Sequence, residues 1–320
     1  MTQASPFFGC THPSAAHTGA AMRAMLVHGL ALSAGIGNRE FMTMPDHQRQ
    51  VPPPEPALPG REPFFNLPGI LVVLIGVLVA VHLARLALAF ETDLRVMAEL
   101  AVVPARFALD LGWMDQTQIL QDTVAGVTQG QAAERMAVAR FFLDDGGARW
   151  WSLLSYGLLH SGTAHIAMNC LWLAVFGSPL ARRIGNVSFL LLLAAGTIAG
   201  AMLHIVMHPS DVAPMVGASA GVSAATGAAA RFVFSQGLRM DMMGDDARVR
   251  ALPALSLAGM VQNRQAMTFV ILWFVTNWLF GAAVVPFADD DSSVAWEAHI
   301  GGFIAGLVLF PLLDSKTAKA

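Results

Sequence analysis

The chain is short of charge. Only 13% of its 320 residues are Asp, Glu, Lys or Arg, against about 25% in ordinary soluble domains. The formal net charge of −3 gives no basic balance that would indicate a nucleic-acid partner. The two cysteines, Cys10 and Cys170, are too few for a disulfide framework. These absences exclude a disulfide-stabilised scaffold, and the 55% apolar content favours a membrane protein.

Six hydrophobic stretches account for the apolar content. Because about 20 apolar residues are needed to cross a bilayer as a helix, we expect each stretch to be one span. Glycines and scattered polar groups within the stretches favour a packed bundle over isolated anchors. The pattern predicts an all-α, polytopic membrane protein with a six-helix bundle. The stretches run from Pro68 to about Phe90, His165 to Leu180, Val187 to Met207, Val212 to Phe234, Met267 to Phe287 and Val294 to Leu313.

The remaining segments divide the chain. Residues 1–67 contain the proline-rich PPPEPALPG at 52–60, which predicts a tail without a fixed fold. Residues 68–313 form the expected membrane domain. Within it, the segment 91–150 is predicted to be partly structured and to lie at the outer membrane surface. Residues 314–320 are expected to be a short cytoplasmic tail.

Basic residues orient the predicted bundle. Short cytoplasmic loops collect Lys and Arg, and the basic residues between and after the stretches fall on one side if the N-terminus is inside. The opposite segments, HPSDVAP at 208–214 and FADDDSS at 287–293, are poor in them. We therefore expect both termini to be cytoplasmic. The basic residues are Arg182, Arg183, Arg231, Arg239, Arg248, Arg250, Arg264, Lys316 and Lys319.

A candidate nucleophile lies in the sequence GASAGVSAATG at 217–227. The stretches that contain His165, Ser219 and His299 all run from outside to inside. Ser219 is placed about seven residues into its stretch and His299 about five into its own. At 1.5 Å per residue, both lie roughly 7 to 11 Å below their helix starts. We therefore expect Ser219, His299 and His165 to meet in one layer near the outer face.

These residue types suit acyl transfer. A serine hydroxyl needs a neighbouring base, and neutral His299 can supply one. His165 and Asn169, at i and i+4, can donate hydrogen bonds to an oxyanion, and the backbone N–H of Ser219 can add another. Gly217 is one of several small residues around the serine. The G-x-x-x-G at 302–306 would let the last span approach Ser219 closely.

With these residues, the chain resembles the rhomboid family of intramembrane serine proteases. The resemblance rests on LLHSGTAHIAMN at 158–169, on the G-x-S at 217–219 and on AHIGGFIAG at 298–306. It implies a catalytic dyad of Ser219 and His299 without a third acidic member, an oxyanion site of His165 and Asn169, and a site-shaping role for His160.

The resemblance also implies partners and location. The expected substrates are single-span membrane proteins cut near the outer ends of their helices, with neither metal nor cofactor involved and the bilayer as the other partner. The expected location is a bacterial plasma membrane.

Three positions depart from the family pattern. Ala220 replaces a frequent glycine, and Trp151 is followed by Ser152 where the family often has arginine, which puts the anchoring of the surface loop in doubt. Ser223 stands where some members have an aromatic residue. Its own predicted role is that of a helix serine hydrogen-bonded to the carbonyl at i−4.

Other readings of the motifs remain as alternatives. An α/β-hydrolase would need a strand before Ser219, and HSGTAH at 160–165 lacks the H-E-x-x-H of a metalloprotease. A transporter would need intramembrane charges, which are nearly absent. The main rival is a rhomboid-like scaffold that binds transmembrane helices without cutting them. The expected positions of His82, His204 and His208 are interfacial rather than metal-binding, and Glu297 is expected to point away from the face of His299.

Overall fold

The structure is a computed structural model that describes residues 67–143, 147–236, 246–281 and 294–314. All of these residues belong to one compact unit, Arg61–Ala320. The predicted N-terminal tail, the loop 287–293 and the three basic residues Arg239, Lys316 and Lys319 lie outside the described residues.

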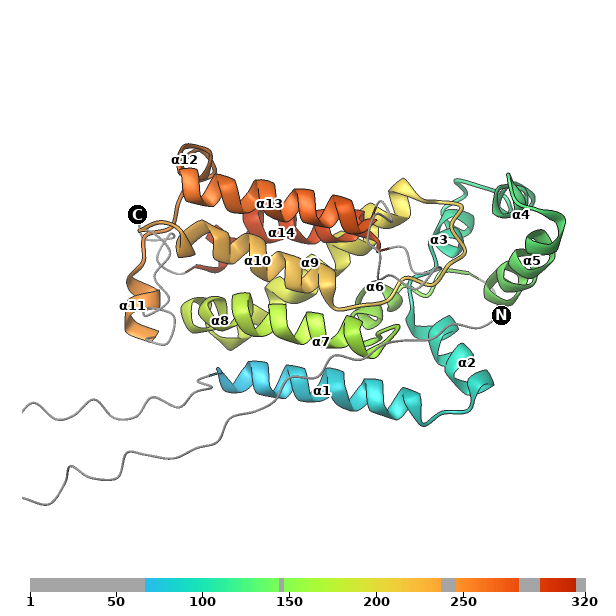
Figure 1. The fold of residues 1–320 in the computed structure, drawn as a ribbon, viewed down its shortest axis with the longest axis horizontal. Helices are drawn as coiled ribbons and strands as arrows, with labels where there is room; N and C mark the ends of the chain where they lie inside the picture. Colours follow the sequence, from blue (N-terminus) through green and yellow to red (C-terminus); the bar gives the residue numbers. More distant parts are fainter. Residues whose placement is uncertain (1–66, 144–146, 237–245, 282–293, 315–320) are drawn as a thin grey trace, which may run out of the picture. The chain divides into compact units, whose positions relative to one another are not determined.

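Most of the described residues are helical (Figure 1). The described residues contain no strand, and their one β-type pairing is an isolated bridge between Val102 and Met215. The expected helical class is therefore confirmed, and the α/β-hydrolase alternative is wrong. The helices are α1 (Gly69–Leu86), α2 (Phe90–Leu100), α3 (Pro104–Asp110), α4 (Gln116–Val124), α5 (Gln129–Leu143), α6 (Ser152–Ser155), η2 (Tyr156–Leu158), α7 (Thr163–Trp172), η3 (Leu173–Gly177), α8 (Ser178–Ile184), α9 (Asn186–Met207), α10 (Ser219–Val233), α11 (Asp246–Ala251), α12 (Leu257–Gln262), α13 (Arg264–Gly281) and α14 (Trp296–Leu313).

Four described helices are long and apolar enough to cross a membrane. They are α1, the continuous helix Thr163–Ile184 formed by α7, η3 and α8, α9, and α14. Two of the six predicted spans do not qualify by themselves. The helix α10 is too short, with only 15 residues. The helix α13 has 18 residues but is less apolar, because it carries Arg264, Gln265 and Asn277. The apolar helices identify an integral membrane protein.

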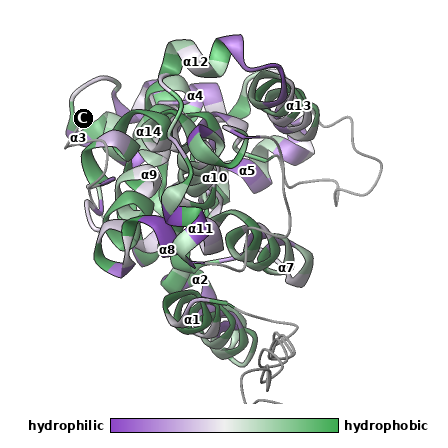
Figure 2. Cartoon of the chain, turned by 90° about the vertical axis from the view of Figure 1, so that its left-hand side faces the viewer, coloured by the Kyte–Doolittle hydropathy of each residue, from purple (hydrophilic) through white to green (hydrophobic). Residues whose placement is uncertain are grey.

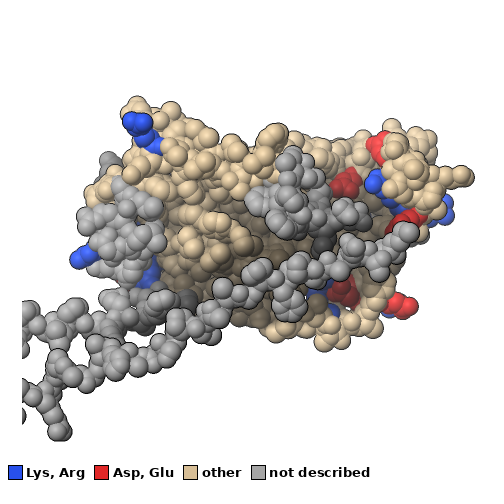
Figure 3. Space-filling view, in the orientation of Figure 1, with Lys and Arg blue, Asp and Glu red and all other residues tan. Residues whose placement is uncertain are grey.

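Polarity is distributed as a bilayer would require. Figure 2 shows hydrophobic residues along α1, α7 and α13, with hydrophilic residues gathered around α8 and α11. On the face seen in Figure 3, charged side chains lie toward the left and right ends, and the described surface between them carries none. An uncharged band between charged ends matches the hydrocarbon and headgroup layers.

Close packing of α9, α10 and α14 forms the centre of the bundle (Figure 1). Cβ atoms added at Gly302 and Gly306 of α14 would overlap the carbonyl oxygens of Ala220 and Ala224 in α10. A Cβ at Gly200 of α9 would lie 2.5 Å from the carbonyl oxygen of Ala298. Small residues therefore let these backbones touch, as the G-x-x-x-G spacing predicts.

The segment before α10 is not helical, which corrects the predicted span 212–234. The helix α10 begins at Ser219 itself, not at Val212. Pro209 and Pro214 cannot donate backbone hydrogen bonds, and Gly217 has a φ of 129°, which side chains disfavour. The serine therefore lies at a helix start rather than seven residues into one.

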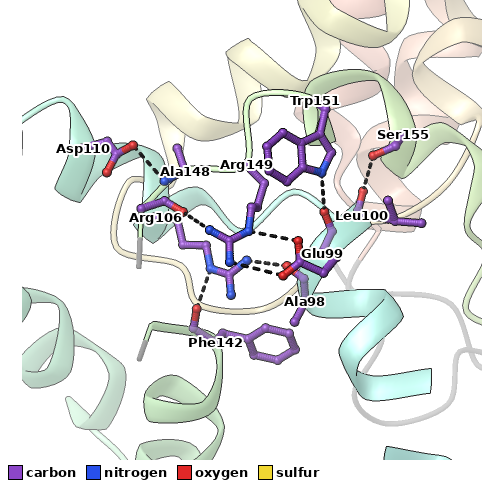
Figure 4. A network of polar contacts seen from close by, with 11 residues as sticks. Ala98, Glu99, Leu100, Arg106, Asp110, Phe142, Ala148, Arg149, Trp151 and Ser155 are labelled. Carbon is purple, nitrogen blue, oxygen red and sulfur yellow. Dashed lines mark hydrogen bonds and ion pairs between the residues drawn. The ribbon is translucent and has the colours of Figure 1, made fainter. Parts of the chain in front are cut away.

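Polar contacts hold the segment 91–150 together and join it to α6 (Figure 4). Arg149 pairs with Glu99, at 3.1 Å between Nε and Oε2, and the indole N–H of Trp151 donates to the Glu99 carbonyl at 2.8 Å. The buried side chain of Arg106 donates to the carbonyl oxygens of Phe142, at 2.5 Å, and Ala98. Arg149 and Arg106 thus hold the segment together internally. The Trp151 indole and the Ser155 hydroxyl, which donates to the Leu100 carbonyl at 2.9 Å, join it to α6.

Candidate active site

The start of α10 decides which backbone N–H groups around Ser219 are bonded within the helix. The first intrahelical hydrogen bond at this end of α10 runs from the Val222 N–H to the Ala218 carbonyl, at 3.0 Å. The preceding strand-like segment is held by the Gly217 N–H, which donates to the Tyr156 carbonyl at 3.0 Å. The N–H groups of Ser219 and its next neighbours therefore have no partner within the helix.

Ser219 and His299 are in direct contact across two helices. The Ser219 Oγ lies 2.7 Å from the Nε2 of His299. His299 is three residues beyond Trp296, the first residue of α14. Both residues thus lie near helix starts, and both are half-buried. The predicted meeting of the two side chains is found, although the depth of Ser219 in its helix was miscounted.

A third residue, Asn277 of α13, holds the other nitrogen of the base. The Nδ1 of His299 lies 2.6 Å from Asn277 Oδ1, while the Asn277 amide group donates to the Trp273 carbonyl at 2.7 Å. Because the amide oxygen can only accept, Nδ1 must carry the proton of the neutral ring. Nε2 is then free to accept from the serine hydroxyl.

Sequence reasoning missed Asn277. It gave a dyad of serine and histidine without a third acidic member, and a lone amide in an apolar stretch did not stand out. The available signal was the cost of burying an asparagine in a membrane helix, which makes a partner necessary. One turn along from Asn277, the ring of Trp273 stacks on Phe303 with centroids 4.2 Å apart, and this contact packs α13 against α14.

His165 approaches the serine from α7. A Cβ atom added to Gly217 would lie 2.7 Å from His165 Nε2 and 3.5 Å from Ser219 Oγ. The glycine therefore makes room for both side chains and adopts a φ that favours glycine. The Nδ1 of His165 is 3.0 Å from the Ser161 hydroxyl.

Asn169 lies one turn further along α7 and is buried. Its amide group donates to the His165 carbonyl at 3.2 Å. This bond uses one of the two amide hydrogens, so the second remains for another acceptor. The predicted pairing of His165 and Asn169 on one helix face is therefore present, with the amide fixed by its own helix.

His160 lies behind His165 rather than beside the serine. The two rings meet edge to face with centroids 5.1 Å apart, and Arg85 donates to the His160 carbonyl at 2.9 Å. Burial, and to a smaller extent the nearby His165, lowers the pKa of His160 to about 4. An uncharged, buried ring suits a residue that positions His165.

Ser223 is buried one turn beyond Ser219. The predicted bond from its hydroxyl to the carbonyl at i−4 is not found among the described residues. Thr226 makes that kind of bond instead, donating to the Val222 carbonyl at 2.9 Å.

The structure shows contacts between two of the other histidines and Glu297. His204 and His208 were expected at the membrane interface, and Glu297 was expected to point away from the face of His299. Glu297 does face away from His299, but it meets both histidines: its carboxylate lies 2.8 Å from His208 and 3.6 Å from His204.

The fold and these contacts define a class: an integral membrane protein of packed helices with a serine and a histidine in contact near helix starts. A model of the Rhomboid domain matches residues 147–315. The chain therefore belongs to the rhomboid family.

Three relatives show how far the likeness extends. The chain is 30% identical over 171 residues to Rhomboid protease GluP of Bacillus subtilis, covering 53% of this chain and 27% of that protein. It is 26% identical over 163 residues to RHOMBOID-like protein 4 of Arabidopsis thaliana, covering 51% and 34%. It is 28% identical over 185 residues to Putative rhomboid protease YdcA of B. subtilis, covering 58% and 78%. The chain thus spans about a third or less of the first two relatives.

Proposed function

We propose that the chain is an intramembrane serine endopeptidase that cuts transmembrane proteins near the outer membrane face. The observation that carries the proposal is the 2.7 Å contact between Ser219 Oγ and His299 Nε2. The protease names of two relatives, GluP and YdcA, support it. Neither a metal nor a cofactor is needed for the steps below.

The contact geometry fits a serine mechanism. The Ser219 oxygen attacks the scissile carbonyl carbon while its proton moves to His299 Nε2. The C–N bond then breaks, and the same proton passes to the leaving amine. A water molecule, deprotonated by His299, cleaves the acyl-enzyme and restores the serine. Asn277 accepts from Nδ1 throughout, and so keeps the ring in the tautomer that the attack requires, as the asparagine of Cys-His-Asn proteases does.

The negative oxygen of the tetrahedral intermediate needs donors. The candidates are the unpaired Ser219 N–H, the His165 ring and the second amide hydrogen of Asn169. When the Ser161 hydroxyl donates to His165 Nδ1, the neutral ring carries its proton on Nε2, the atom nearest Gly217. Three donors from α7 and α10 would then surround the site next to Ser219 Oγ.

Removing one oxyanion donor is expected to slow the chemical step. Asn169→Ala should lower kcat for a transmembrane substrate about 10²-fold, and His165→Ala should lower it similarly. The measurement is cleavage in detergent micelles with substrate varied, so that kcat and KM separate. Met168→Ala, on the exposed side of α7, is the matched control. Full turnover by the Asn169→Ala and His165→Ala variants would remove both residues from the oxyanion site.

Asn277 is expected to act as a positioning residue. Asn277→Leu should lower kcat by about 10- to 100-fold with KM nearly unchanged, because the ring loses the acceptor that fixes its tautomer. Asn277→Asp, which keeps an oxygen at the same place, should recover most of the activity. Both variants should unfold at the same temperature as the wild type within a few degrees. Equal activity of the leucine and aspartate variants would show that Asn277 does not orient the base.

Topology follows from the same proposal. We propose six spans, with α10 and α13 added to the four long helices and both termini on the cytoplasmic side of a bacterial plasma membrane. The support is the cluster of charges at one end, where Arg183 pairs with buried Asp314 at 2.8 Å and Arg231 donates to the Leu307 carbonyl at 2.9 Å.

A topology reporter inserted at Pro253, between α11 and α12, is expected to report the cytoplasmic side. A second reporter fused after residue 320 should agree with it, because both positions follow the basic end of the bundle. The measurement compares reporters that are active on only one side of the membrane. A periplasmic signal at Pro253 would invert the proposed orientation and move the site to the inner face.

A further inference from the structure

A second cluster of functional groups lies apart from the Ser219–His299 contact. It consists of His204 and His208, near the end of α9, and Glu297 in the first turn of α14. The His208 Nε2 lies 2.8 Å from Glu297 Oε1, and the His204 Nδ1 lies 3.6 Å from Glu297 Oε2. One nitrogen from each ring and one carboxylate oxygen all lie within 4.8 Å of one another.

The cluster is only partly satisfied by its own hydrogen bonds. Glu297 and His204 are buried, with exposed fractions of 5% and 7%. His204 Nδ1 has no hydrogen-bond partner in the described part of the chain, since 3.6 Å is too long for one. Burying the Glu297 carboxylate costs free energy, and so does burying the His204 ring nitrogen without a hydrogen-bond partner. A bound cation would satisfy the two groups together.

The donor set selects the cation. Two imidazole nitrogens and one carboxylate oxygen are the three protein ligands of many zinc sites, with water in the fourth position. Bonds of 2.0–2.2 Å in a tetrahedral site place the ligand atoms about 3.3 to 3.6 Å apart. The His208–Glu297 distance of 2.8 Å is shorter than this and the 4.8 Å limit of the whole set is longer, so the side chains must adjust to bind a metal. The His208 side chain is 42% exposed, so it can adjust, and it leaves the site open to water on one side.

We propose that His204, His208 and Glu297 form a Zn²⁺ site that joins the end of α9 to the start of α14. The two helices already touch here, because the Gly200 backbone packs on the Ala298 carbonyl. Glu297 is two residues before His299, so the metal fixes the helix turn that carries the base. The role is to hold that turn in place, and the ion takes no part in peptide hydrolysis.

The test is Zn²⁺ binding to the purified full chain in detergent, followed by calorimetry and by metal analysis after dialysis. The residues of the first 67 that could bind zinc by themselves are replaced in the parent chain: Cys10 by serine, and His12, His17, His28 and His47 by glutamine. We expect one Zn²⁺ per chain and a rise of several degrees in Tm when Zn²⁺ is added.

Two variants separate a metal site from a simple ion pair. His208→Gln and Glu297→Gln should each weaken Zn²⁺ binding by about tenfold or more, and should abolish the Zn²⁺-dependent rise in Tm. Both glutamines can still hydrogen-bond, and His208 is half-exposed, so folding without metal should persist. Glu91→Gln, an exposed carboxylate at the start of α2, is the matched control and should bind Zn²⁺ as the parent does.

The opposite result overturns the proposal. If the parent binds no stoichiometric Zn²⁺, or if the two variants bind it as well as the parent, the three residues form an ion pair only. The readout does not use hydrolysis, so a Ser219→Ala chain should bind Zn²⁺ equally. Failure of the zinc site would leave the proposed protease function untouched, and the reverse holds too.

Discussion

Ser219→Ala is expected to abolish cleavage of a transmembrane substrate. The variant lacks the oxygen that attacks the carbonyl, so the loss should reach the background, at least about 10⁴-fold. His299→Ala should fall to the same level, because the hydroxyl then has no base. The double variant should be no worse than either single one, since residues that act as a unit are not additive. The measurement is single-turnover cleavage in reconstituted vesicles.

Ser223→Ala is the matched control for this experiment. It removes the same hydroxyl one turn further along α10, where nothing in the described chain accepts its proton. Activity within about twofold of the wild type is expected, because alanine is smaller than serine and no hydrogen bond of the described chain is lost. A larger loss in Ser223→Ala than in Ser219→Ala would show that Ser223, and not Ser219, is the nucleophile.

Gly302→Ala is expected to separate the reacting side chains. A methyl group there overlaps the Ala220 carbonyl, a backbone atom that cannot move aside, so α14 must shift away from α10. Overpacking of this kind costs about 1–3 kcal/mol or more. Because Ala220 follows Ser219 directly, a shift of about 1 Å would break the 2.7 Å contact and cost about 10²-fold in kcat.

The matched control is Gly76→Ala in α1. An added Cβ at this position meets nothing within 4 Å. The same substitution should therefore leave activity unchanged and should stabilise the helix slightly, by about 0.5–1 kcal/mol. Thermal unfolding and cleavage are measured on both variants. If Gly302→Ala is as active and as stable as Gly76→Ala, the close approach of α10 and α14 is not what holds the site together.

Much of the fold could be predicted from the lengths of the hydrophobic stretches. The stretches that became α1, α9 and α14 are long and nearly uncharged, so their length alone indicated spans. The start of α10 did not follow, because the residues before Ser219 are mostly small or apolar and continue the hydrophobic stretch. Its first seven residues are held instead by distant partners: Met215 pairs with Val102, and Gly217 bonds to Tyr156. Such pairings override local propensity, and one sequence does not reveal them.

Part of the site could be predicted from the chemistry of its residues. Ser219, His299 and His165 were predicted to meet because three separate segments agreed in approximate depth, and that agreement tolerated the miscounted helix start. The two missed features depend on side-chain directions across helices. Asn277 belongs to α13 and reaches the far nitrogen of His299, and Glu297 turns toward His208. The spacing of residues along the sequence does not show how one helix is rotated about its axis relative to another.

Labelling by a fluorophosphonate probe in isolated membranes tests the central claim most directly. The probe reports a serine oxygen made nucleophilic by its base, and peptide mapping of the adduct identifies the residue. We expect one adduct, on Ser219, that is lost in His299→Ala and kept in Ser223→Ala. Absence of any adduct on the inserted wild-type chain, together with no cleavage of a transmembrane substrate, would contradict it and favour a rhomboid-like scaffold that binds helices without cutting them.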